Sequence, residues 1–335
     1  MNKPIKARII GTGSYLPEKV LSNQDLEKLV ETSDEWIVTR TGMKERRIAR
    51  DDEYTSDMGY AAALCAIEAA KISPEEIDLI LVATTTPDYI FPSTACLLQA
   101  RLKAVNAAAI DLQAACTGYV YALSQAKAYV DAGMYKNILI VAAEKLSSIV
   151  NYKDRNTCVL FGDGAAACIV SDRGKGLVIR DVGLGADGEL AGLVIIPAGG
   201  SRQPASCQSV ADGLHYLQMG KETYKHAVRR MEMASKQCLD RAGLAESEIS
   251  WIVPHQANVR IIEGIAKRFG VPMERIYLTI HKYGNTSASS IGIALDELLH
   301  EKGIKQGENL LLVAFGAGLT WGASVLTWDE EEYHE

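Results

Sequence analysis

The chain has 335 residues, of which 48% are hydrophobic and 23% are charged, and its formal net charge is −7. This length suits roughly two domains and buries about three quarters of the unfolded surface, so disulfides are not needed for stability. The acidic balance argues against a general nucleic-acid surface. Seven cysteines without CxxC spacing favour reduced thiols in the cytoplasm over disulfides or a metal site. The first residues include lysines but no apolar stretch, so we expect no secretory signal.

Apolar runs of strand length alternate along the chain with helix-length segments, several of which stop at a glycine. In chain order, the predicted strands cover residues 7–10, 77–83, 107–111, 138–142, 165–170, 249–253, 310–314 and 324–327. The predicted helices cover residues 57–71, 117–132, 222–242 and 287–302. Strands that alternate with helices predict an α/β fold with helices on both faces of a sheet.

One segment, from Leu310 to Trp328, carries no charge and is long enough to cross a membrane as a helix. However, Gly316, Gly318 and Gly322 interrupt it, a pattern that favours two strands joined by a glycine turn. We therefore expect no membrane span.

The chain also repeats itself. Residues 73–80 resemble residues 245–252, and residues 137–142 resemble residues 309–314, both at a displacement of 172 positions. The repeat predicts two similar α/β halves, 1–172 and 173–335, related by a pseudo-twofold axis. A seam between such halves is a favoured place for a functional site.

Cys116 follows the predicted strand 107–111 and stands where a helix begins. The unpaired N–H groups and partial positive charge of a helix N-terminus stabilise a thiolate. Small neighbours leave room for a substrate, so Cys116 is the candidate nucleophile. We interpret five other cysteines as buried structural residues, namely Cys65, Cys96, Cys158, Cys168 and Cys238.

Two polar residues occupy similar places in the second half. His255 follows a proline at the end of the predicted strand 249–253, and Asn285 precedes the helix that matches the one after Cys116. The carboxyl ends of strands are where open α/β folds place ligands. From spacing alone, His255 could equally be a hydrogen-bonding loop residue, and Asn285 an ordinary helix cap or turn residue.

Two glycine-rich stretches have different interpretations. The sequence FGAGLTWG at 315–322 predicts a turn whose backbone N–H groups could bind an oxyanion, or else a simple tight hairpin. Gly11 and Gly13 begin like a dinucleotide-binding fingerprint, but Leu16 occupies the third glycine position. We therefore predict no nicotinamide cofactor.

Six motifs together resemble the β-ketoacyl-acyl-carrier-protein synthase III family over essentially the whole chain. They are DLQAACTG at 111–118, PHQAN at 254–258, HKYGNTSAS at 281–289, FGAGLTWG at 315–322, DEWIVTRTGM at 34–43 and FGDGA at 161–165. The resemblance implies the thiolase fold, a five-layered αβαβα arrangement of two duplicated α/β halves. It also implies condensation of a short acyl-CoA, such as acetyl-CoA, with malonyl-acyl-carrier-protein, which initiates fatty acid synthesis without a cofactor or metal.

The resemblance also assigns catalytic roles. Cys116 accepts the acyl group from acyl-CoA. The Nε2–H of His255 and the amide of Asn285 donate to the oxygen of the malonyl thioester while CO₂ leaves. Backbone N–H groups of Cys116 and Ala317 form the oxyanion hole for the acyl-cysteine. Some members of the family carry glycine in place of Ala317, but the backbone donor is the same.

Further residues match the family's binding positions. Trp36 and Arg155 would stack on the adenine of CoA, Arg40 would contact CoA, and Phe91 would close the acyl pocket across a homodimer interface. The expected carrier-protein docking residues are Lys225, Gln256, Arg260, Lys267 and Arg268. Positions 260, 264, 267, 268 and 271 follow helical spacing, so the cations there could share one face. The alternative for them is an ordinary solvated helix face.

Three alternatives remain open at this point. A relative with the same Cys/His/Asn set could act on a different donor or acceptor in a specialised pathway. A cysteine hydrolase could use the same three residue types, although the papain-type CGSCW sequence is absent and Cys116 is far from the N-terminus. A non-catalytic carrier-protein-binding module is a third alternative, but the intact Cys116, His255 and Asn285 argue against it.

Overall fold

The computed structural model describes residues 7–220 and 222–333. Nine of the described strands form one sheet, in the order β11-β12-β13-β8-β1-β7-β6-β4-β5. Their bounds are β1 (Arg8–Tyr15), β4 (Leu79–Ala83), β5 (Ala108–Leu112), β6 (Asn137–Glu144), β7 (Gly164–Ser171), β8 (Gly174–Ala186), β11 (Ile249–Pro254), β12 (Asn309–Gly316) and β13 (Thr320–Tyr333). The long helices are α3 (Thr55–Ala70), α4 (Thr94–Leu102), α5 (Gly118–Asp131), α8 (Thr223–Ala242), α9 (Val259–Phe269) and α11 (Ser289–Lys302).

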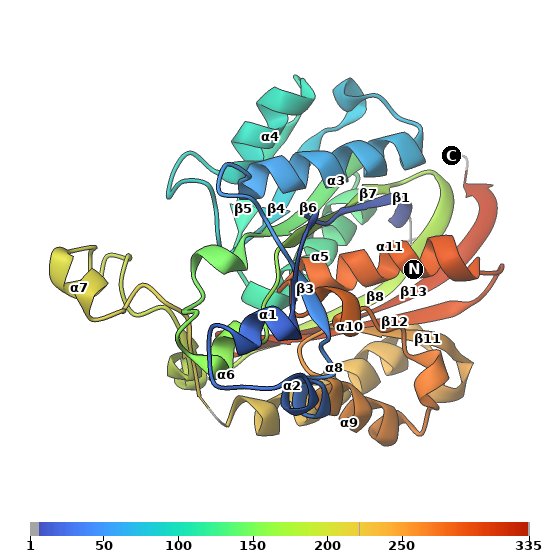
Figure 1. Ribbon diagram of the computed structural model, residues 1–335. Helices are drawn as coiled ribbons and strands as arrows, with labels where there is room; N and C mark the ends of the chain where they lie inside the picture. The colour runs from blue at the N-terminus through green and yellow to red at the C-terminus, as the bar shows by residue number, and fades with distance from the viewer. Residues whose placement is uncertain (1–6, 221, 334–335) are drawn as a thin grey trace.

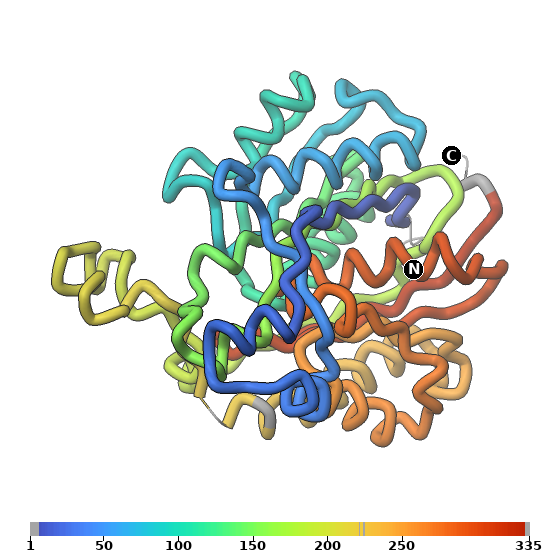
Figure 2. The backbone as a smooth tube through the Cα atoms, in the orientation of Figure 1, coloured from blue at the N-terminus to red at the C-terminus, as the bar shows by residue number. Residues whose placement is uncertain are grey.

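The other described helices and strands are shorter and lie outside this sheet. The helices among them are α1 (Asn23–Glu27), α2 (Asp34–Thr41), α6 (Arg155–Cys158), α7 (Cys207–Ala211) and α10 (Ile280–Tyr283). Two small sheets pair β2 (Lys19–Ser22) with β3 (Glu45–Ile48) and β9 (Val194–Ile195) with β10 (Gln218–Met219). Between β8 and α8, the chain leaves the body and forms a projecting segment that includes α7 (Figure 2).

The strands on the two sides of the β1–β8 contact follow the same spatial order. Outward from β1, the first group is β7, β6, β4 and β5, with the last two pairings parallel. Outward from β8, the second group is β13, β12 and β11, and Ile276 then bridges Ile252 in parallel at the place of β5. The predicted boundary at 172 falls between β7 and β8. The repeated order supports the division into two halves, which remains a proposal.

Three apolar cores separate five layers. One core lies between α3 with α4 and the first strand group, and another lies between the second strand group and α8 with α9. The third core surrounds α5 and α11, which lie side by side between the two strand groups. Figure 1 shows these layers stacked from α4 at the top to α9 at the bottom. This is the αβαβα arrangement predicted from the sequence.

The central strands of each group are buried on both faces. Along β6, Ile140 packs into the core around α5 and α11, whereas Val141 packs into the core under α3. Along β12, Leu312 and Val313 divide in the same way between the central core and the core over α8. Strands covered on both faces read as continuous apolar runs, which is why the sequence reveals them so clearly.

The predicted strands and helices are present, with shifted ends, but the sequence did not reveal β8. Its sequence, GKGLVIRDVGLGA, mixes glycines and charges because much of the strand is partly exposed. The segment from Leu310 to Trp328 forms the predicted strand–turn–strand, with β12 antiparallel to β13 from Asn309 opposite Thr327 to Gly316 opposite Thr320. Among the described residues, no helix is both long and apolar enough to cross a membrane.

Gly11 and Gly13 have a packing role. A Cβ added at Gly11 would lie 2.5 Å from the backbone oxygen of Ala66, and one at Gly13 would lie 2.5 Å from Cβ of Cys65. Both glycines therefore let α3 approach β1 closely, which explains the pattern without a dinucleotide.

Candidate active site

Cys116 lies in a tight turn between β5 and α5. A single 3₁₀ turn, Ala115–Thr117, precedes the α-helix. Ala115 has φ of 45°, a left-handed conformation that is strained for a residue with a side chain. The hydroxyl of Thr117 donates to the carbonyl of Ala114 over 2.5 Å and holds this turn. Backbone strain of this kind concentrates at functional sites.

The β12–β13 turn packs directly against Cys116. A Cβ added at Gly316 would lie 2.9 Å from the backbone nitrogen of Cys116, so this position has no room for a side chain. Thr320 Oγ1 donates to the carbonyl of Ala317 at 2.9 Å and lies 2.7 Å from Thr117 Oγ1. The expected oxyanion donors, Cys116 and Ala317, thus belong to two turns in contact.

Asn285 is held beside the same turn. Its backbone N–H donates to Leu160 at 2.9 Å, and its carbonyl accepts from Gly162 at 3.0 Å. Its side-chain Oδ1 accepts from the backbone N–H of Ser287 at 2.8 Å, which leaves the amide Nδ2 as the donor toward a substrate. Ser287 has φ of 55°, and its Oγ lies 3.6 Å from Cys116 Sγ. Asn285 thus orders the loop that contacts the nucleophile.

His255 is 2% exposed and follows β11. Its Nδ1 lies 2.7 Å from Ser290 Oγ, and this hydroxyl also accepts from the backbone N–H of Gln256 at 3.3 Å. With Nδ1 assigned as the acceptor of the Ser290 proton, the remaining ring proton lies on Nε2, the tautomer that the proposed donor role of His255 requires. Burial lowers the pKa of His255 to about 3, so the imidazole is neutral at physiological pH.

The sequence predicts a stabilised thiolate at Cys116, but the structure favours the neutral thiol. Desolvation raises the pKa of its thiol to about 11, and this outweighs the lowering effects of Ser287 and of the backbone at the turn. The helix N-terminus therefore does not suffice to ionise the resting thiol. Outside the site, Cys65 and Cys96 are exposed, which corrects their prediction as buried residues, whereas Cys158, Cys168 and Cys238 are buried as expected.

One buried acid close to the nucleophile, Glu144, is not predicted by any sequence motif. Glu144 ends β6, is fully buried, and raises the pKa of Cys116 by electrostatic repulsion. Burial in turn raises the pKa of Glu144 to about 7. A charged residue at the carboxyl end of an apolar strand was the available signal, since such ends meet at ligand sites.

The three residues expected to bind CoA lie together at the surface. The guanidinium of Arg40 lies 4.7 Å from the ring centre of Trp36, and that of Arg155 lies 5.2 Å from it. Arg155 also donates to the carbonyl of Glu31 at 2.9 Å. A surface cleft of 440 Å³, lined in part by Val30, Glu31 and Arg155, adjoins this cluster. An indole with two cations suits a stacked base and phosphate groups.

The predicted docking residues divide into exposed cations and one buried amide. Lys225, Arg260, Lys267 and Arg268 are exposed on α8 and α9. Arg268 forms an ion pair with Glu232 at 3.2 Å, and Arg260 donates to the carbonyl of Thr39 in α2 at 3.4 Å. Arg260 therefore adjoins the helix that carries Trp36 and Arg40.

Gln256 is a wrong prediction as a docking residue. It is fully buried, and its amide donates to the carbonyls of Pro254 and Tyr277 and accepts from the backbone N–H groups of Thr279 and Ile280. It therefore holds the strand end that carries His255 and cannot contact a carrier protein.

Phe91 is 84% exposed, next to Ile90, which is 88% exposed. Both lie in the loop between β4 and α4. Within one chain, Phe91 therefore does not close a pocket by itself.

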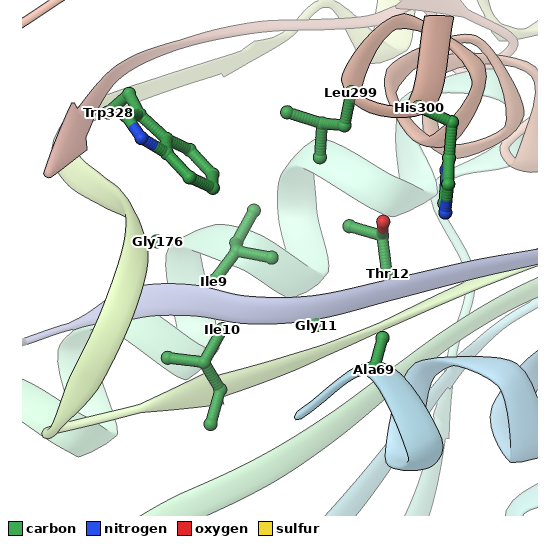
Figure 3. A pocket seen from close by; sticks show the side chains of 9 residues that line it. All are labelled: Ile9, Ile10, Gly11, Thr12, Ala69, Gly176, Leu299, His300 and Trp328. Atoms are coloured by element: carbon green, nitrogen blue, oxygen red, sulfur yellow. The ribbon is translucent and has the colours of Figure 1, made fainter. Parts of the chain in front are cut away.

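A separate cavity lies away from Cys116. It has a volume of 180 Å³ and is lined by residues of β1, α3, β8, α11 and β13. Figure 3 shows Thr12, His300 and Trp328 around it. Thr12 donates to Asp296 at 2.7 Å, and His300 Nδ1 lies 2.8 Å from the carbonyl of Asp296, so Thr12 and His300 have internal partners. In the described part of the chain, no cluster of His, Cys, Asp and Glu could hold a metal ion.

Comparisons with known proteins point to one family. Family models described as 3-oxoacyl-[acyl-carrier-protein] synthase III and its C-terminal part match residues 110–188 and 239–328. The chain is 61% identical to the β-ketoacyl-[acyl-carrier-protein] synthase III of Chlamydia caviae, over 96% of both chains. It is 52% identical to that of Caldanaerobacter subterraneus, over 98% of this chain and all of the relative. The crystal structure of 3-oxoacyl-[acyl-carrier-protein] synthase III from Aquifex aeolicus has a TM-score of 0.89 at 48% identity, and covers 96% of this chain and all of its own.

Proposed function

The chain belongs to the β-ketoacyl-acyl-carrier-protein synthase III family, and we propose that it condenses a short acyl-CoA with malonyl-acyl-carrier-protein to initiate fatty acid synthesis. The observation that carries this proposal is the contact of the Cys116 turn with both the Asn285–Ser287 loop and the Gly316 turn. The relatives do not favour a hydrolase or a specialised-pathway synthase.

In the first half-reaction, Cys116 attacks the thioester carbonyl of acyl-CoA. A bond forms between Cys116 Sγ and the acyl carbon, the bond from that carbon to the CoA sulfur breaks, and CoA leaves as a thiol. Because one thioester replaces another, the exchange needs no external energy source. The Trp36, Arg40 and Arg155 cluster holds the nucleotide end of CoA in this proposal.

In the second half-reaction, the malonyl group loses CO₂ and negative charge develops on its thioester oxygen. His255 Nε2–H and Asn285 Nδ2–H donate to that oxygen as two neutral groups. The resulting carbanion attacks the acyl carbon, and the oxyanion formed there accepts from the N–H groups of Cys116 and Ala317. The bond to Cys116 then breaks and releases the 3-ketoacyl-carrier-protein. Cys116 leaves as a thiolate and takes one proton from solvent, which restores the resting thiol and balances the loss of the malonyl carboxylate as CO₂.

The proposal includes a homodimer in the cytoplasm. β5 ends the sheet, and Ile110 within it is 52% exposed. The nearby loop exposes Ile90 and Phe91. An apolar sheet edge beside an apolar loop is suited to a second copy of the chain, whose acyl pocket Phe91 would then close. All seven cysteines are free, as is usual in a reducing compartment.

The test is intact-mass analysis after exposure to acetyl-CoA and related short acyl-CoAs. The wild-type protein should gain one acyl group at Cys116, whereas Cys116→Ser should gain none, because a serine hydroxyl does not ionise as a thiol does. Cys158→Ser is the matched control and should acylate normally. An adduct on another cysteine, or none on the wild type with any acyl-CoA offered, would overturn the proposal.

A further inference from the structure

Glu144 is a buried acid that the condensation described above does not use. It is the last residue of β6, a strand that lies in the layer between α3 and α5 (Figure 1). Glu144 has no exposed surface. Its Oε2 accepts from the backbone N–H of Thr85 at 3.1 Å, from Thr85 Oγ1 at 2.9 Å and from Thr86 Oγ1 at 3.2 Å. Oε1 is also buried, but accepts no hydrogen bond from the described residues at normal length. One oxygen is therefore anchored, and the other is available for a further proton.

Ser287 connects this acid to the nucleophile. Its Oγ lies 3.6 Å from Cys116 Sγ, and its hydroxyl is also among the groups that lower the pKa of Glu144. Because Thr85 and Thr86 account for the bonds at Oε2, Oε1 is the oxygen left for a further donor. A serine hydroxyl both donates and accepts, so it can pass a proton along a chain of three groups.

The first half-reaction requires such a group. The Cys116 thiol is protonated at rest, and its proton must leave before or during attack on the thioester. His255 is held by Ser290 on Nδ1, and its assigned tautomer carries the ring proton on Nε2. In that tautomer His255 has no ring nitrogen free to accept a proton, and it is a donor for the second half-reaction.

We infer that Glu144 is the proton acceptor for Cys116 in acylation and acts through Ser287. The thiol proton moves to Ser287 Oγ while the hydroxyl proton of Ser287 moves to Glu144. The new S–C bond forms, and the S–C bond of acyl-CoA breaks. The reverse shift through Ser287 then returns the proton to the leaving CoA sulfur. Nothing is oxidised or reduced, and the net change is one thioester for another.

The surroundings of Glu144 suit this role. A general base works best when its pKa lies near the working pH, and burial raises the pKa of Glu144 to about 7. The groups that face it are Cys116 and the neutral hydroxyls of Thr85, Thr86 and Ser287. The next residue, Lys145, directs its ammonium group to the carbonyls of Arg50 and Glu53 instead.

The first measurement is the rate of acylation by acetyl-CoA, in rapid-quench experiments between about pH 5.5 and 8.5. The second is the rate at which pre-acylated enzyme decarboxylates malonyl-acyl-carrier-protein. In the wild type, acylation should rise with pH through about 7 and then level off, because the base must lose its proton first. Glu144→Gln should slow acylation by about 10²-fold or more and remove this inflection. Ser287→Ala should do the same, whereas Glu144→Asp should recover part of the rate.

Decarboxylation should change much less than acylation in all three variants. Asp296→Asn is the matched control, since Asp296 is another buried carboxylate that accepts from hydroxyls, those of Thr12 and Ser14. It should keep both the rate and the inflection. A wild-type inflection retained in Glu144→Gln, or equal losses in both half-reactions with no recovery in Glu144→Asp, would overturn the inference. This inference rests on the proposed function, and the wild-type adduct at Cys116 in the same experiment tests that function independently.

Discussion

Burial sets the charge of both titratable residues of the proposed Cys/His/Asn set. His255 is neutral because burial lowers its pKa to about 3, and Cys116 is a thiol because burial raises its pKa to about 11. Neither His255 nor Cys116 therefore carries a charge before the malonyl group loses CO₂. Neutral donors that meet a newly formed enolate bind it more strongly than the ground state, which is the condition for catalysis.

A histidine that only donates should be dispensable for acylation. His255→Ala should still form the acyl-Cys116 adduct at close to the wild-type rate, whereas its CO₂ release should fall by about 10²- to 10³-fold, because one oxyanion donor is lost. The two half-reactions are measured separately, by intact mass and by labelled CO₂. His215→Ala removes a histidine that bonds Ser209 instead and should leave both rates intact. An equal loss of acylation in His255→Ala would make the imidazole the base.

Sequence motifs lead to the proposal of Cys116, His255 and Asn285, but they do not reveal the residues that surround them. Gln256 shares a motif with His255, yet it turns inward to satisfy backbone groups at 277–280, which no local pattern reveals. Glu144 obtains its hydroxyl donors from positions 85 and 86, and Ser287, about 200 positions later, lowers its pKa. These residues come together only when the chain folds, so no local sequence pattern reveals them.

At the scale of elements, α9 presents an apolar face inward and cations outward. Ile262, Ile265 and Phe269 are buried, and Lys267 is exposed. Helical spacing grouped Arg260, Lys267 and Arg268, which are all exposed, and their role in docking stays a prediction. It could not predict that Arg268 pairs with Glu232 on α8, because the partner lies on another helix. We therefore expect Lys267 to contribute more to docking than Arg268.

Charge reversal on α9 should affect one substrate. Arg260→Glu should raise the KM for malonyl-acyl-carrier-protein by about tenfold at low salt, because a favourable contact with an acidic partner becomes a repulsion. The loss should shrink at high salt, where the Debye length falls to about 3 Å at 1 M. Acylation by acetyl-CoA should change less. Lys302→Glu, an equal change in charge at the far end of α11, should leave the KM unchanged. A salt-independent loss in both half-reactions would indicate a structural role for Arg260.

At the scale of the whole molecule, the repeated strand order places two helix starts face to face. The turns that precede α5 and α11 carry Cys116 and Ser287, and Gly118 permits their approach, since an added Cβ there would lie 3.2 Å from Cβ of Ala288. The repeat in the sequence predicted this seam. The strained conformations of Ala115 and Ser287 were not predictable, because they depend on the packing of both halves.

The proposed homodimer has a consequence for acylation that a single chain would not show. If β5 pairs with its copy, a lysine in place of Ile110 would be buried twice at the twofold axis, without a partner of opposite charge. Ile110→Lys should therefore raise the dissociation constant of the dimer by about 10²-fold or more, which corresponds to about 2.8 kcal/mol. Sedimentation equilibrium measures this constant. Acylation should fall together with the dimer fraction and recover at high protein concentration, because Phe91 of the other copy closes the pocket. Met134→Lys, at a residue that is 63% exposed in the turn after α5, is the matched control and should remain dimeric. A fully active monomer would exclude the role of Phe91 across the interface.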